Sequence, residues 1–75
     1  MTKSSIYEVV SINIKKYRKL KGISTKELAL KTGYSHAYIR RLESNCKKTF
    51  TILTIAVIAN ALDIDIKCLF DEVDI

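Results

Sequence analysis

The sequence predicts an all-α fold, a compact domain of five helices. Two observations on its 75 residues support this prediction. The chain contains no proline, and no segment alternates apolar and polar residues as a half-buried strand does. Instead, helix-capping residues recur in front of apolar residues at helical spacing. The helices are therefore expected at about residues 6–21, 25–32, 36–44, 52–62 and 66–71.

The first helix is indicated by a stripe of apolar residues with helical period. Gly22 directly follows this stripe and marks the end of the helix. We expect the helix to bury one face, formed by Ile6, Val9, Val10, Ile14, Tyr17 and Leu20.

The four later helices share one device at their starts. Each is preceded by a residue whose side-chain oxygen can accept a hydrogen bond from a backbone N–H of the first turn. These capping residues are Ser24, Ser35, Thr51 and Asp65. An apolar residue stands directly before each cap and another stands five positions later, which is the spacing of a hydrophobic staple. The staple pairs are Ile23 with Leu28, Tyr34 with Ile39, Phe50 with Ile55, and Ile64 with Leu69.

The second and third helices are joined by a tight turn. Ser24 and Glu27 have the spacing of a capping box, and Gly33 can adopt the left-handed conformation that ends a helix. The inward side chains of the third helix are Ile39 and Leu42. Its other side presents His36, Ala37, Arg40 and Arg41. An exposed helix face with two adjacent arginines is suited to the base edges and phosphates of a nucleic acid.

Charge is distributed unevenly along the chain, whose net charge is +5. Residues 15–48 contain eleven basic side chains against two acidic ones, whereas residues 49–75 contain one basic side chain against five acidic ones. One part of the molecule is therefore expected to meet a polyanion. The alternative is a generally basic, solvated surface, which the uneven split makes the less favoured interpretation.

Length and composition argue against several other classes of protein. A chain of 75 residues is expected to form one domain. No apolar run approaches the roughly 20 residues of a membrane span, and the N-terminus lacks a signal-peptide pattern, so we expect a cytoplasmic protein. Two cysteines, Cys46 and Cys68, are too few for a structural zinc site and should stay reduced. With one histidine and no glycine-rich phosphate loop, the chain indicates no metal, cofactor or small-molecule site, and no enzyme is expected.

Residues 24–43 also carry a family pattern. The pattern Ser-x-x-Glu-Leu-Ala-x-x-x-Gly-Tyr-Ser-x-x-x-Ile-x-x-Leu-Glu resembles the helix-turn-helix of the Cro and phage-repressor family, also called the XRE type. The resemblance extends from about Val10 to Phe70, and it implies a lambda-repressor-like domain with a helix-turn-helix formed by the second and third helices. Residues 6–71 are thus expected to be a single DNA-binding domain. A flexible N-terminus, residues 1–5, would precede it, and an acidic tail, residues 72–75, would follow.

The resemblance implies roles for individual residues. Base edges would be contacted by His36, Ala37, Arg40 and Arg41. Phosphates would be contacted by Ser24, Thr25, Tyr38, Lys47 and Lys48. Asn45 stands at the usual glycine position after the recognition helix, and asparagine tolerates the left-handed conformation needed there. Arg18 and Glu43 match positions that form a partly buried ion pair in relatives, and we expect them to pair here.

The fourth helix is apolar on nearly all sides. Its expected inward residues are Ile52, Ile55, Ala56, Ile58, Ala59 and Leu62. Leu53 and Val57 lie on another face, where relatives commonly carry polar residues, and a helix that is apolar on several sides requires burial on more than one of them. With Ile64 and Phe70, these two residues are expected to form a dimer or partner surface. The alternative is that the acidic end of the chain folds back over this surface.

Together these features predict a sequence-specific regulator of transcription that binds double-stranded DNA, most often as a repressor. Such single domains commonly act as homodimers on inverted repeats, with half-sites about 34 Å apart. The alternative is a protein-binding module, such as an antitoxin or an adaptor, that uses the apolar surface of the fourth and fifth helices.

Overall fold

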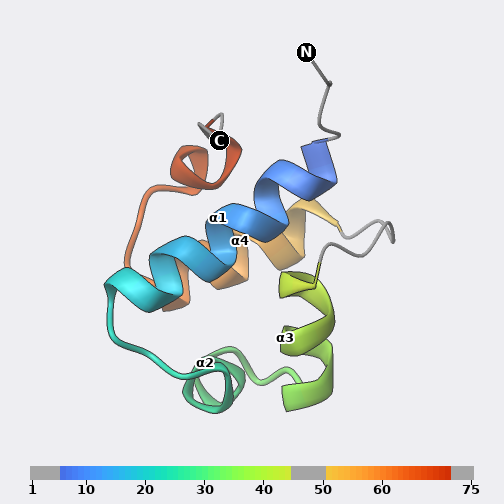
Figure 1. The fold of residues 1–75 in the computed structure, drawn as a ribbon, viewed down its shortest axis with the longest axis vertical. Helices are drawn as coiled ribbons and strands as arrows, with labels where there is room; N and C mark the ends of the chain where they lie inside the picture. Colours follow the sequence, from blue (N-terminus) through green and yellow to red (C-terminus); the bar gives the residue numbers. More distant parts are fainter. Residues whose placement is uncertain (1–5, 45–50, 72–75) are drawn as a thin grey trace.

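The computed structural model describes residues 6–44 and 51–71, which form helices and no strand (Figure 1). The elements are α1 (Ile6–Leu20), α2 (Thr25–Thr32), α3 (His36–Glu43), α4 (Ile52–Ala61) and the 3-10 helix η1 (Ile66–Phe70). Figure 1 shows α1 crossing the middle of the molecule, with α2 and α3 on one side and η1 on the other. α1 packs against α3 and η1, α2 packs against α3 and α4, and α4 also packs against η1. The expected N-terminal segment and acidic tail lie outside the described residues.

The last predicted helix is not an α-helix, so the described residues form four α-helices where five were expected. In η1 the backbone N–H of Cys68 donates to the carbonyl oxygen of Asp65 at 2.9 Å, which is the tighter spacing of a 3-10 turn. A segment of five residues is too short to gain much from regular α-helical bonding. The other helices match within one residue, since α1, α3 and α4 each end one position earlier than expected.

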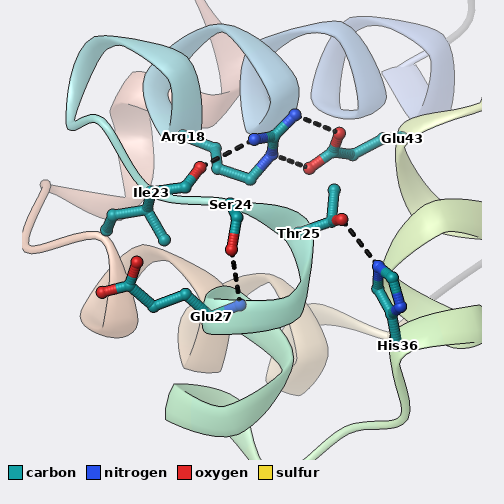
Figure 2. A network of polar contacts seen from close by, with 7 residues as sticks. All are labelled: Arg18, Ile23, Ser24, Thr25, Glu27, His36 and Glu43. Carbon is teal, nitrogen blue, oxygen red and sulfur yellow. Dashed lines mark hydrogen bonds and ion pairs between the residues drawn. The ribbon is translucent and has the colours of Figure 1, made fainter.

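The predicted caps are present at all four later helix starts. The Ser24 hydroxyl accepts from the backbone N–H of Glu27 at 3.0 Å (Figure 2). The Ser35 hydroxyl accepts from Tyr38 N–H at 3.0 Å. The same device starts α4 and η1, where the acceptors are Thr51 Oγ1 and Asp65 Oδ1. Because each bond spans two or three residues, local sequence decides where these helices begin.

Residues in the left-handed conformation end three of the helices, and the first is Gly22, which has φ 70° after α1. Gly33 has φ 81° and donates its N–H to Ala29 at 2.9 Å, which closes α2 and turns the chain towards α3. Asp63 has φ 57° and performs the same task after α4, with Ile64 N–H bonded back to the Ala59 carbonyl. Aspartate is among the few non-glycine residues that tolerate this conformation.

One hydrophobic core joins all five elements. Its buried members are Val10, Ile14, Leu28, Ala29, Ile39, Leu42, Ile55, Ile58, Ala59, Leu62 and Leu69. The partly buried staple residues Ile23, Tyr34 and Ile64 pack against it. No helix of the described part of the chain has the length and apolar character needed to cross a membrane.

Some residues that were expected to face inward are exposed. In α1, Ile6 and Leu20 are exposed because they lie at the two ends of the helix, while the polar residues Ser11 and Asn13 are buried near its middle. In α4, Ile52 and Ala56 are exposed. The buried face of α4 follows Thr54, Ile55, Ile58, Ala59 and Leu62. The predicted helices are present, but the prediction that Ile6, Leu20, Ile52 and Ala56 face inward is wrong.

The buried Asn13 attaches the C-terminal segment to α1. Its Nδ2 group donates to the carbonyl oxygens of Leu69 at 2.9 Å and Asp71 at 2.8 Å. Nearby, desolvation raises the pKa of the Tyr17 hydroxyl, and the neighbouring Cys68 and Asp71 raise it further. Asn13, a buried polar residue of α1, therefore holds η1 in place.

Candidate nucleic-acid interface

The helix-turn-helix consists of α2, α3 and the turn of residues 33–35 between them. Leu28 and Ala29 bury the inner face of α2, and Ile39 and Leu42 bury that of α3. In the turn, the Tyr34 ring packs edge-on against Tyr38, with the ring centroids 5.0 Å apart. These contacts fix the angle between the two helices and leave the outer side of α3 free.

The outer side of α3 is polar and basic. All four residues expected to contact bases are exposed there, namely His36, Ala37, Arg40 and Arg41. They share one short helix whose N-terminus is capped and whose inner side is fully used by the core. The core fixes the position of α3. The backbone of α3 therefore sets the directions in which these exposed side chains leave the helix.

The C-terminal end of α3 is held by an ion pair between Arg18 and Glu43 (Figure 2). Arg18 Nε lies 2.6 Å from Glu43 Oε2, and its NH2 group lies 3.1 Å from Oε1, so that the contact is bidentate. A third nitrogen donates to the backbone carbonyl of Ile23 at 2.7 Å. The side chains are only 11% and 6% exposed, so each charge depends on its partner for stabilisation. One guanidinium group thus joins α1, the turn before α2, and the end of α3.

The N-terminal end of α3 is held by a second polar contact. Thr25 Oγ1 and His36 Nε2 lie 2.7 Å apart, and each belongs to the first residue of its helix (Figure 2). Thr25 follows Ile23, the acceptor of the third Arg18 hydrogen bond, by two residues. α3 is therefore held at its C-terminal end by α1 and at its N-terminal end by α2. The sequence alone does not predict this contact, because a threonine and a histidine eleven residues apart form no local pattern.

The residues expected to contact phosphates are only partly brought together. Ser24 is exposed and caps α2. Thr25 is half-buried, and its hydroxyl is hydrogen-bonded to His36. Tyr38 is half-buried and packs against Tyr34. Lys47 and Lys48, like Asn45, lie outside the described residues. Lys26 and Lys31 of α2 were not among the expected phosphate contacts. Both are exposed, and they add to the basic character of this side.

The expected dimer or partner surface divides into two parts. Leu53 is 68% exposed and Val57 is half-buried, whereas Ile64 and Phe70 pack against the core. Ile52, which was expected inside, is 64% exposed beside Leu53. The strongest exposed apolar feature of α4 is therefore its first turn.

Acidic, histidine and cysteine side chains do not gather anywhere in the described residues. No three of them lie close enough together to hold a metal ion within residues 6–44 and 51–71. The arrangement described above can present hydrogen-bond donors and positive charge to a polyanion.

Comparison with known proteins gives a consistent result. The helix-turn-helix family model HTH_3 matches residues 14–67. The chain is 34% identical over 64 residues to the HTH-type transcriptional regulator SinR of Bacillus subtilis (strain 168), an alignment that covers 85% of this chain and 58% of SinR. The chain thus corresponds to little more than half of that relative.

Two solved structures combine sequence and structural similarity. The crystal structure of SinR, the master regulator for biofilm formation, in complex with DNA is 34% identical with a TM-score of 0.76, covering 83% of this chain and 98% of that one. The restriction-modification controller protein C.Esp1396I, solved as a tetramer with its natural 35 base-pair operator, is 31% identical with a TM-score of 0.79. That alignment covers 91% of this chain and 88% of the controller protein.

Proposed function

Because this chain belongs to the HTH_3 helix-turn-helix family, we propose that it is a DNA-binding transcriptional regulator that inserts α3 into the major groove of double-stranded DNA. Residues 6–71 are the DNA-binding unit in this proposal. The observation that carries it is the outer side of α3, where Arg40 and Arg41 are exposed on a helix fixed at both ends. A helix held in this way presents its side chains to base edges with little loss of conformational freedom.

The roles within the interface follow from the chemistry of each side chain. Arg41 donates two parallel hydrogen bonds to the O6 and N7 atoms of a guanine, and Arg40 contacts a neighbouring base or phosphate. The Ala37 methyl group meets a thymine methyl group, and His36 contacts a further base edge. Ser24, Thr25 and Tyr38, with Lys47 and Lys48, contact phosphates, which position the protein without specifying a sequence.

We further propose that the regulator acts as a homodimer on an inverted repeat. The exposed apolar residues at the start of α4, Ile52 and Leu53, support an interface there, since burying them removes apolar surface from water. The solved complex of C.Esp1396I contains a tetramer on its operator, so assembly on DNA occurs among similar proteins. The same residues would serve an antitoxin or adaptor role if the partner were another protein.

The proposal is tested by selecting bound duplexes from a random pool and measuring the affinity of the selected site. We expect Arg41→Ala to lose preference at one base pair of each half-site, a loss of about 1–3 kcal/mol in discrimination, while weak binding to any duplex persists. Lys67→Ala, an exposed cation on η1, is the matched control and should bind like the parent. Failure to enrich any sequence, with uniformly weak binding that falls steeply with salt, would contradict the proposal.

A further inference from the structure

The contact between Thr25 and His36 lies inside the proposed DNA interface. Thr25 Oγ1 and His36 Nε2 are 2.7 Å apart in an exposed setting (Figure 2). In the proposed function, one of these residues contacts a phosphate and the other contacts a base. The hydrogen bond between them therefore links a proposed phosphate contact directly to a proposed base contact.

The direction of this hydrogen bond decides what each side chain can offer to DNA. A hydroxyl group donates one hydrogen bond and accepts others, whereas each imidazole nitrogen either donates or accepts. When Nε2 carries no proton, the Thr25 hydroxyl donates to it, and its hydrogen is no longer available to a phosphate. When Nε2 carries a proton, it donates to Thr25 Oγ1, and the hydroxyl hydrogen becomes free.

Protonation of the ring makes both side chains donors at once. In the charged imidazole, Nε2–H donates to Thr25 and Nδ1–H remains free to donate to an acceptor on a base edge. The Thr25 hydroxyl then donates to a phosphate oxygen. It cannot do so while its hydrogen is bonded to Nε2. When the base offers an acceptor, the neutral ring allows only one of these two donations to DNA in either tautomer.

We propose that Thr25 and His36 form one recognition unit, in which Thr25 positions the imidazole ring and DNA binding is accompanied by the uptake of a proton at His36. This inference rests on the proposed function and specifies how two of its residues cooperate. Thr25 acts here as a positioning residue for the base contact and as a conditional donor to the phosphate.

The neighbouring charges make DNA the source of this coupling. Lys26 from α2 and Tyr34 from the turn line a shallow hollow together with His36, and Arg40 lies one helical turn further along α3. None of the described residues that line this hollow is acidic. A DNA phosphate brings the negative charge that favours the charged ring, so proton uptake belongs to the complex.

The experiment measures the dissociation constant of the selected duplex at constant salt from about pH 6 to pH 8, the range in which histidine changes its charge. His36 is the sole histidine of the chain, which makes the pH profile specific. We expect the parent to bind roughly tenfold more tightly per protomer at the acidic end, the effect of about one added hydrogen bond. His36→Gln should have a flat profile, Thr25→Val should lose most of the slope, and Thr25→Ser, which keeps the hydroxyl, should retain it.

The outcomes separate this inference from the function on which it rests. A parent that selects a site but binds it with the pH profile of His36→Gln overturns the inference and leaves the function standing. A Thr25→Val profile equal to that of the parent overturns the role of Thr25. If no site is selected at all, the proposed function fails first, and the inference fails with it.

Discussion

Arg18 links α1 to α3 and to the turn before α2 through its guanidinium group. It makes three hydrogen bonds, two to Glu43 and one to the carbonyl oxygen of Ile23, and its side chain is 11% exposed. Without Arg18, the carboxylate of Glu43 would be a poorly solvated charge. The pair therefore orients the end of α3 and, through Ile23, the stretch from which Thr25 contacts the start of α3.

Replacing Arg18 with methionine is expected to lower the free energy of unfolding by about 3 kcal/mol, because Glu43 is left as a poorly solvated charge. Urea denaturation followed by circular dichroism measures this change. The double variant Arg18→Met with Glu43→Leu should be more stable than Arg18→Met alone, since it removes the stranded charge. Equal stability of the parent and Arg18→Met would mean that the pair contributes nothing to the fold.

At the scale of the elements, η1 depends on a side chain from α1 and on little regular structure of its own. It has five residues in 3-10 geometry, and the two hydrogen bonds from Asn13 Nδ2 meet carbonyl groups at and just beyond its end. Leu69 supplies its buried apolar contact. The element therefore exists because the tertiary structure supports it.

Asn13→Ala should lower the free energy of unfolding by about 2 kcal/mol, because the two carbonyl groups lose their donor and a buried side chain is removed. Faster amide hydrogen exchange should appear first in residues 66–71, measured by NMR. Asn60→Ala is the matched control, since Asn60 is exposed on α4 and should change stability by less than about 0.5 kcal/mol. Uniformly unchanged exchange in η1 would show that Asn13 does not hold it.

On the scale of the whole molecule, the exposed arginines of α3 and the exposed apolar residues at the start of α4 lie on different elements. Basic residues surround α2 and α3, while the exposed apolar residues Ile52 and Leu53 lie at the start of α4. A protein that binds a palindrome needs one surface for DNA and another for its own copy. The proposed homodimer uses this separation.

Leu53→Glu is expected to convert a dimer into a monomer, because a carboxylate in an apolar contact must be desolvated without a partner. Sedimentation velocity of the parent and the variant measures this directly. Leu20→Glu provides the control, since Leu20 is 69% exposed at the end of α1 and is not part of the proposed interface. The same sedimentation coefficient for the parent and Leu53→Glu would exclude this surface from the dimer.

The sequence by itself determined the features that depend on neighbours a few residues apart. The caps at Ser24, Ser35, Thr51 and Asp65 and the turn at Gly33 all rest on hydrogen bonds within four residues, and all are present. The extents of α1 to α4 therefore followed within one residue. The pattern of residues 24–43 identified the helix-turn-helix, which the family match over residues 14–67 supports.

Apart from the Arg18–Glu43 pair, which the family resemblance implied, only the tertiary structure decided which polar groups meet across long separations. The burial of Asn13 depends on carbonyl groups more than fifty residues away, and the contact of Thr25 with His36 depends on the angle between two helices. Exposure of Ile52 and Ala56 likewise follows from which side of α4 the other helices cover. Local hydrogen bonds are written in adjacent residues, whereas these contacts exist only because packing of the core brings distant segments to one place.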